Sequence, residues 1–321
     1  MAGDGHESGG AIAAAFAANM GIAVTKFAGF IITGSSSLLA ESIHSVADSS
    51  NQGLLFLGGR QATQAPDELH QFGHGRVRYF WAFVVSVVLF SLGGLFSVYE
   101  GYHKIHDPHE IDSPAVAIGI LAVAFVLESF ALRTAVKHAT PQRGKRSWRQ
   151  YISESRSPEL PTLLLEDSGA LIGLACALLG VSLAVITGEP VFDGIGTLAI
   201  GLVLFAIAFV LAREMRSLLI GESAAPELER QIDAEFERGP EVRRVIHTLT
   251  QHIGPDEILI AAKVEFEPDL TTKQIVDAIN AAEERVRAIP GIGTARIYVE
   301  PDIGPAETVA EAAPPPPASA H

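Results

Sequence analysis

Residues 34–55 read GSSSLLAESIHSVADSSNQGLL and bring ionisable side chains into a long apolar part of the chain. Glu41, His44 and Asp48 are spaced three and four residues apart, so a helix places them along one face. Charged groups are costly inside a bilayer, and those that persist there usually face a cavity and have a function. An imidazole and a carboxylate one turn apart can bind one divalent cation such as zinc. The alternative is a polar stripe that only holds helices together.

Apolar stretches on both sides of this segment are long enough to cross a membrane, which takes about 20 mostly apolar residues. Six stretches qualify, and they cover residues 11–33, 38–60, 79–101, 114–135, 161–187 and 193–215. The chain of 321 residues is 48% hydrophobic and only 19% charged, with a mean hydropathy of +0.28. We therefore predict a membrane all-α domain, a six-helix transmembrane bundle over residues 11–219, and not an enzyme.

Residues 220–302 carry charges throughout and predict a small soluble α/β domain. The pattern predicts, in order, a helix at 226–238, strands at 242–250 and 258–266, a helix at 272–288 and a strand at 294–299. This is an αββαβ order. Residues 303–321 are rich in proline and alanine, and we expect them to be disordered, as we do residues 1–10.

Basic residues of the connecting segments fall almost entirely on one side of the predicted bundle, with Lys104 as the exception. Cytoplasmic flanks accumulate lysine and arginine. We therefore expect a multi-pass protein of a bacterial inner (plasma) membrane, with both termini and the α/β domain in the cytoplasm. The net charge of −14 disfavours nucleic-acid binding. A single cysteine, Cys176, excludes a disulfide framework or a cysteine-based metal site within one chain.

Two further acids stand at the start of the fifth stretch, where Glu166 and Asp167 are adjacent. Neighbours on a helix point about 100° apart, so we prefer Asp167 as the metal ligand and keep Glu166 in reserve. Stabilisation of the helix N-terminus by this acid pair is the alternative. Glu128 in the fourth stretch is another membrane carboxylate, and Lys26 in the first is a candidate partner for one of these acids.

The loop after the second stretch, PDELHQFGHGRVRYF, offers one carboxylate and two imidazoles. Asp67, His70 and His74 are enough for an exposed metal site with three ligands. A polar loop without metal is the alternative.

These features together resemble the cation diffusion facilitators, the solute carrier 30 family. The resemblance rests on six spans with both ends inside, ESIHSVAD in the second span, the loop FGHGRVRY, a basic linker and the αββαβ domain. SIHSVADSSNQGLL, FGHGRVRYFWAFVVS and LLLED are most similar to the zinc-transporter-nine branch. The resemblance implies a homodimeric, proton-coupled exporter of divalent metal. It also implies a ferredoxin-like or metallochaperone-like cytoplasmic domain that serves dimerisation and metal sensing.

Carried over residue by residue, the resemblance implies a transport site of four ligands between the second and fifth spans. His44, Asp48 and Asp167 match three positions, and the fourth falls on Leu163, which cannot bind metal. Glu166, Glu128, Glu41, a water or nothing takes that place. Glu41 and Glu128 are also candidate proton carriers. Asp67, His70 and His74 match the family's membrane-proximal metal site.

In the α/β domain, His247 keeps a family metal position, whereas Lys263, Tyr298 and Glu300 depart from the pattern. A partial metal site there would use four residues, namely His247, His252, Glu265 and Glu300. We weigh it against a dimerisation domain without tightly bound metal and favour the latter.

The expected function is export of divalent metal, with zinc as cargo and no other cofactor. Metal needs neutral imidazole and ionised carboxylate, so loading expels protons and protonation expels metal. Because one imidazole with several oxygens is a harder donor set than a typical zinc site, iron(II), manganese, cobalt or nickel are alternative cargoes. A membrane scaffold that senses metal without transporting it is the other alternative.

Overall fold

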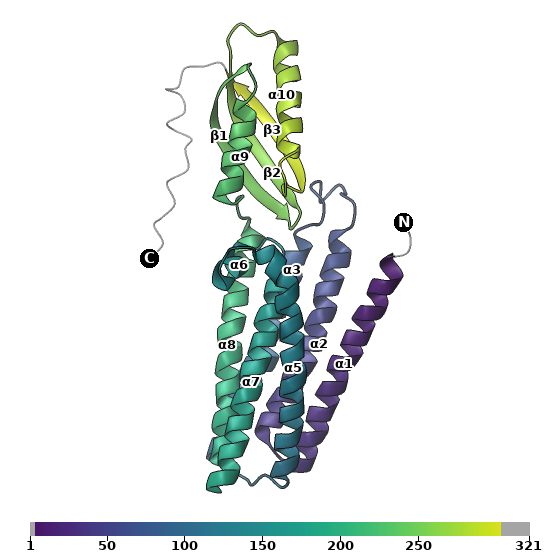
Figure 1. Cartoon of the computed structure of the whole chain (residues 1–321), viewed down its shortest axis with the longest axis vertical. Coiled ribbons are helices and arrows are strands. Elements are labelled where there is room, and N and C mark those ends of the chain that lie inside the picture. Colours follow the sequence, from purple (N-terminus) through teal and green to yellow (C-terminus); the bar gives the residue numbers. More distant parts are fainter. Residues whose placement is uncertain (1–3, 303–321) are drawn as a thin grey trace. The chain divides into compact units, whose positions relative to one another are not determined.

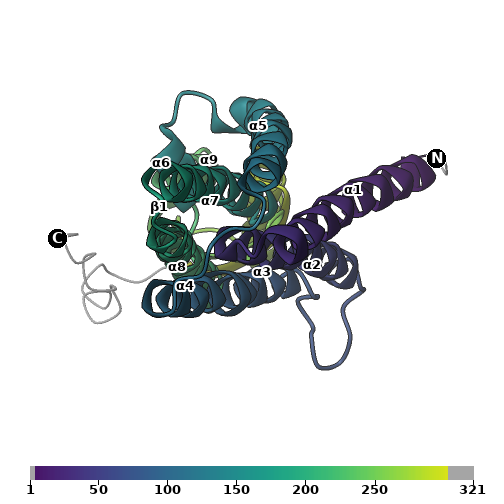
Figure 2. The same cartoon turned by 90° about the horizontal axis from the view of Figure 1, so that it is seen from below.

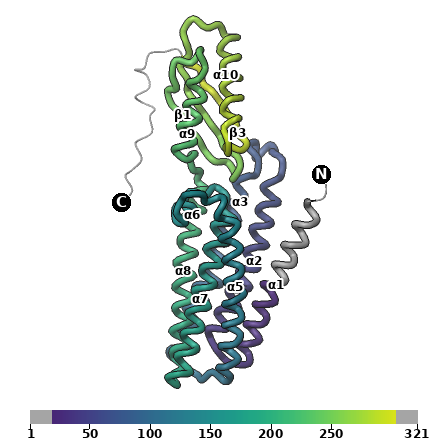
Figure 3. Tube along the Cα trace, in the orientation of Figure 1, coloured from purple at the N-terminus to yellow at the C-terminus, as the bar shows by residue number. Residues whose placement is uncertain are grey.

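The computed structural model describes the backbone of residues 4–302 and the side chains of residues 19–302 (Figure 3). The chain divides into two compact units. The first consists of residues 1–65 and 77–219, and the second consists of residues 66–76 and 220–321. The predicted tail at 303–321 lies outside the described residues.

The first unit is a bundle of long helices, shown in Figure 1 and, along the helices, in Figure 2. Its elements are α1 (Asp4–Thr33), α2 (Ser36–Ala62), α3 (Val77–Val88), η1 (Leu89–Leu95), α4 (Phe96–His106), α5 (Pro114–Arg143), α6 (Trp148–Glu154), α7 (Glu159–Thr187) and α8 (Val191–Ile220). α3, the π-helical η1 and α4 follow one another without a break. α2 contacts α1, α3, α4 and α7, and α5 contacts α1 and α7. The helix that carries ESIHSVAD is therefore central to the packing.

Four helical segments are long and apolar enough to cross a membrane, which makes the chain a multi-pass membrane protein. They are Val77–His106, Pro114–Arg143, Glu159–Thr187 and Val191–Ile220. Large apolar side chains such as Phe130, Leu202 and Phe209 are exposed on these helices, as expected of a surface that meets lipid. α1 contributes a shorter apolar stretch, Asn19–Thr33. α2 is too polar to meet the same criterion because its interior face carries serine, glutamate and histidine, so crossing by α1 and α2 stays a prediction.

Two boundaries in the structure differ from the expected ones. α1 already begins at Asp4, so the expected disorder of residues 1–10 does not hold from there on; the alanine-rich stretch that follows favours helix and extends it backwards. Residues 66–76 belong to the second unit rather than to the membrane domain. The reason is a close backbone contact, since a Cβ on Gly75 would lie 2.8 Å from the Ile253 carbonyl oxygen and 2.9 Å from Gly254 Cα. Arg296 also lies over the Phe72 ring, 5.8 Å from its centroid.

The start of α2 is fixed by Asp193 of α8, which is fully buried. Asp193 Oδ2 accepts hydrogen bonds from the Ser36 backbone N–H at 2.9 Å and from Ser36 Oγ at 3.2 Å. Its Oδ1 accepts from the Ser37 N–H at 3.3 Å and from Ser35 Oγ at 3.1 Å. Backbone N–H groups of a first helical turn have no partner within the helix. A carboxylate from another helix therefore supplies the missing acceptors and joins the N-terminal ends of α2 and α8.

Glycines bring α4 and α8 close together. A Cβ on Gly101 would lie 2.6 Å from Leu198 N, and one on Gly201 would lie 2.7 Å from Val98 Cγ2. The backbones approach too closely for a side chain at either position. The glycine-rich pattern of the last span thus serves close helix packing.

The second unit has the predicted element order. It contains α9 (Pro226–Glu237), β1 (Val242–Gly254), β2 (Glu257–Phe266), α10 (Thr272–Arg287) and β3 (Thr294–Asp302). The sheet order is β1-β2-β3, with β1 antiparallel and β3 parallel to β2. Ile232, Phe236, Ile260, Val264 and Val286 belong to its core. β1 runs four residues further than the predicted strand at 242–250 because it pairs with β2 as far as Gly254.

Candidate metal centre

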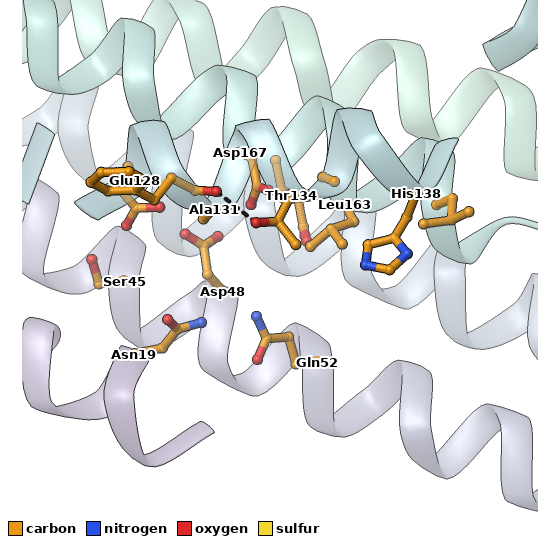
Figure 4. A pocket seen from close by; sticks show the side chains of 14 residues that line it. Asn19, Ser45, Asp48, Gln52, Glu128, Ala131, Thr134, His138, Leu163 and Asp167 are labelled. Carbon is orange, nitrogen blue, oxygen red and sulfur yellow. Dashed lines mark hydrogen bonds between the residues drawn. The ribbon is translucent and has the colours of Figure 1, made fainter. Parts of the chain in front are cut away.

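A cavity of about 410 Å³ lies among α1, α2, α5 and α7 of the first unit (Figure 4). Four carboxylates line it, namely Asp48, Glu128, Glu166 and Asp167. Further polar side chains line it as well, namely Asn19, Ser45, Gln52, Thr134 and His138. Figure 4 shows Asp48 from α2, Glu128 from α5 and Asp167 from α7 around the same space. Carboxylates from three helices that converge inside a membrane domain are suited to bind a cation.

His44 and Asp48 are adjacent, as their spacing predicts, with His44 Nε2 3.4 Å from Asp48 Oδ2. The cavity lining includes Asp48, whereas His44 is 1% exposed and lies towards η1. A Cβ on Gly93 of that segment would lie 3.7 Å from His44 Nδ1. Neither ring nitrogen has a hydrogen-bond partner among the described residues. The imidazole is thus buried beside Asp48, and in its neutral form one of the two ring nitrogens can bind a ligand.

Glu166 and Asp167 both line the cavity, although we expected that they would not face it equally well. Their surroundings separate their roles. Glu166 is 4% exposed, and its Oε1 accepts a hydrogen bond of 2.6 Å from Asn51 Nδ2 of α2. This bond ties α7 to α2 at the level of the cavity. Asp167, which is not tied in this way, stays the better candidate for a metal ligand.

Leu163 lines the same cavity one helical turn before Asp167. Its apolar side chain stands in the wall where the family resemblance places a fourth ligand. The structure therefore agrees with the sequence that this position offers no donor atom.

His138 is a polar residue of the cavity that the sequence reasoning missed. The fourth stretch was expected to end at residue 135, before His138, whereas α5 continues to Arg143. The signal was present in the spacing. Glu128, Ala131, Thr134 and His138 follow one another at intervals of three or four residues, and all four line the cavity.

Glu41 is not an open carboxylate of this cavity. Its Oε2 lies 3.0 Å from Lys26 Nζ of α1, and both side chains are buried. The expected pairing of Lys26 with a membrane acid is present. Glu41 is therefore engaged by a cation of the protein itself.

The loop residues Asp67, His70 and His74 do come together. Their donor atoms lie within 4.8 Å of one another, and no other group of three or more is found among the described residues. Asp67 Oδ1 is 3.1 Å from His70 Nδ1, and Asp67 Oδ2 is 3.5 Å from His74 Nε2. Hydrogen bonds from the backbone N–H of His70 and then from its side chain lower the pKa of Asp67 below the usual 3.8, so this carboxylate is ionised at neutral pH.

The proposed partial metal site of the α/β domain does not assemble. Glu265 is buried against two arginines, with its Oε1 2.9 Å from Arg243 Nη1 and its Oε2 2.6 Å from Arg244 Nε. Glu300 pairs with Lys263 at 3.0 Å across β2 and β3. His247 lies opposite Lys263 in the β1–β2 register, and His252 lies opposite Ile258. Guanidinium and ammonium groups thus occupy the acids that a metal would need.

The chain is similar in sequence to known proteins over most of its length. Residues 12–220 match the family described as the cation efflux transmembrane domain. The chain is 32% identical over 254 residues to the human "Proton-coupled zinc antiporter SLC30A9, mitochondrial", which covers 78% of this chain and 45% of that protein. It is 27% identical over 251 residues to "Metal tolerance protein C4" of Arabidopsis thaliana, covering 77% and 55%.

A bacterial relative is more similar in length. "Magnetosome protein MamM" of Paramagnetospirillum magneticum is 25% identical over 266 residues, covering 80% of this chain and 76% of that protein. By contrast, the chain spans about half the length of the human and Arabidopsis relatives that it matches. The match over residues 12–220 and the similarity to SLC30A9 show that the chain belongs to the cation efflux family, the cation diffusion facilitators, and lies close to the SLC30A9-like branch.

Proposed function

We propose that the protein exports divalent metal cations, with zinc as the main cargo, in exchange for protons. The observation that carries the proposal is the cavity inside the helix bundle, where Asp48, Glu128, Glu166 and Asp167 meet. Several carboxylates in such a place are compensated either by a bound metal cation or by protons, and an antiporter exchanges these two. The printed name of the human relative, a proton-coupled zinc antiporter, supports both the cargo and the counter-ion.

The mechanism follows from competition for the same atoms. Asp48 and Asp167 bind metal when ionised, and His44 joins them as neutral imidazole from its place beside Asp48. A proton on any of these groups removes a donor and weakens the hold on the metal. Metal loaded from one side is thus expelled by protons from the other when the helices alternate their opening. Glu128 and His138 line the same cavity and are suited to carry those protons.

The loop residues Asp67, His70 and His74 form a second proposed metal site, which lies in the second unit. The ionised carboxylate next to two imidazoles supports it. We also propose a homodimer joined through the α/β units, with the chain ends and these units in the cytoplasm of a bacterial plasma membrane. The basic residues of the connecting segments support this orientation.

Transport by the full chain in liposomes tests the proposal. Uptake of Zn²⁺, Fe²⁺, Mn²⁺, Co²⁺ and Ni²⁺ is followed with and without an imposed pH gradient, together with the pH inside the vesicles. We expect zinc to give the fastest flux, and protons to move in the opposite direction. Asp48→Asn and Asp167→Asn should each slow zinc flux by about 100-fold, whereas Glu154→Gln, at an exposed position of α6, should not.

Three results would contradict the proposal. Absence of metal-dependent flux for every ion would favour a scaffold that senses metal. Faster flux of another ion than of zinc would reassign the cargo. If zinc flux in the Asp48→Asn protein equals that of the unsubstituted protein, the cavity is not on the transport path.

A further inference from the structure

The first unit contains a buried ion pair that the proposed transport cycle does not use. Lys26 of α1 and Glu41 of α2 are 1% and 0% exposed, with Lys26 Nζ 3.0 Å from Glu41 Oε2. Such a pair is weak grounds for stability, because removing two charges from water costs about as much as their attraction returns. Ionisable residues in membrane domains usually serve ions or substrates instead. The position of the pair relative to the cavity gives it such a role.

Ser45 connects the ion pair to the cavity. Lys26 Nζ donates a hydrogen bond to Ser45 Oγ at 2.8 Å, and Ser45 lines the cavity together with Asp48. Glu41, Ser45 and Asp48 lie on one face of α2 because they are spaced four and three residues apart. Glu41 is therefore a carboxylate about 10 Å along the helix axis from the proposed ligand Asp48.

One carboxylate oxygen of Glu41, Oε1, has no hydrogen-bond partner among the described residues. A Cβ on Gly173 of α7 would lie 2.7 Å from this oxygen, so only glycine leaves room for it there. A buried carboxylate with a free oxygen is a good ligand for a divalent cation, and the Lys26 ammonium neutralises this carboxylate from its other oxygen, Oε2, at 3.0 Å.

We propose that Lys26 is a tethered internal cation that occupies Glu41 and so prevents this carboxylate from retaining metal beside the transport cavity. The inference rests on the proposed metal transport and deepens it. It makes Lys26 a positioning residue that sets how tightly the cargo is held. It also means that Glu41 is not the fourth ligand that Leu163 fails to supply.

Charge removal in the full-length protein tests this role. Lys26→Met removes the ammonium, and Lys26→Met combined with Glu41→Gln removes both charges. Lys104→Met is the matched control, because Lys104 is also buried but donates to the Gly34 carbonyl oxygen at 3.3 Å. Binding of zinc chloride is measured by titration calorimetry in detergent, and zinc flux is measured in liposomes.

We expect Lys26→Met to bind zinc about tenfold more tightly and to turn over about tenfold more slowly, because a released carboxylate holds the bound metal. In the double variant, zinc affinity and turnover should return to the values of the unsubstituted protein. Lys104→Met should leave both quantities unchanged. Unchanged zinc affinity in Lys26→Met overturns the inference, and so does a double variant that is altered as much as the single one. A purely structural role for Lys26 would not produce this rescue.

If Lys26→Met does not fold, the zinc affinity of the double variant is compared with that of the unsubstituted protein. An equal affinity supports the inference, and a tenfold lower affinity overturns it. The inference is tested by equilibrium zinc binding, whereas the proposed function is tested by zinc flux. If the unsubstituted protein binds zinc but does not transport it, only the proposed function is overturned.

Discussion

Replacing Asp193 by alanine should destabilise the helix bundle, because this carboxylate satisfies the N-terminal end of α2. The substitution removes the acceptor for the backbone N–H groups of Ser36 and Ser37, which lie 2.9 and 3.3 Å from it. Each buried donor left without a partner costs about 1–3 kcal/mol, so the loss of both lowers the free energy of unfolding by about 4 kcal/mol. The Ser36 hydroxyl group adds little to this loss, because Ser36 Oγ also lies 3.0 Å from Thr197 Oγ1.

The measurement is the unfolding of the purified protein in mixed detergent, followed by helical circular dichroism. Asp193→Asn keeps one acceptor oxygen and should cost about half as much, about 2 kcal/mol. Glu189→Ala is the control, since it removes an exposed acid from the connection just before α8 and should change the free energy by less than about 0.5 kcal/mol. If Asp193→Ala unfolds within about 1 kcal/mol of the unsubstituted protein, the carboxylate does not hold the start of α2.

Three further predictions concern the cavity, the loop and the α/β unit. Leu163→His places an imidazole in the cavity wall and should tighten zinc binding about tenfold in titration calorimetry; unchanged affinity would show that this wall does not face the metal. The pKa of Asp67 is lowered below 3.8. The stabilisation that its ionised carboxylate gives the loop is therefore fully present above pH 3.8 and is lost as the pH falls through the lowered pKa. The amide resonance of His70 should therefore move only in acid, and Asp67→Asn should abolish the movement. Glu265→Gln should destabilise the α/β unit by about 1–2 kcal/mol, because it leaves two half-exposed arginines without their partner; altered zinc binding instead of altered stability would restore this residue as a metal ligand.

Much of the fold follows from local patterns of the sequence. Apolar stretches of membrane length predict helices, four of which meet the criterion for crossing, and the alternation of patterns after residue 220 predicts the order of α9, β1, β2, α10 and β3. The assignment of residues 66–76 to the second unit was not predictable in this way. It depends on Gly75 and Gly254, two glycines far apart in sequence whose backbones pack together. No local periodicity reports such a contact.

The candidate site was predicted in part for a similar reason. Asp48 and Asp167 are conspicuous because ionised groups are rare in apolar helices, and both line the cavity. The direction of His44 depends on which neighbour α2 packs against on that side, and spacing along one helix does not specify the neighbour. His138 was missed because the end of α5 was placed too early. The pairing of Glu41 with Lys26 depends on how α1 packs against α2, which the spacing within either helix leaves open.

The membership of residues 66–76 in the second unit has a mechanical consequence. The chain passes between the units three times, after Ala65, before Val77 and after Leu219. The α/β unit is thus covalently connected to the C-terminal end of α2 and the N-terminal end of α3, as well as to α8. Ala62, the last residue of α2, is about 21 Å along the helix from Asp48, so the α/β unit is connected through a single helix to a proposed metal ligand.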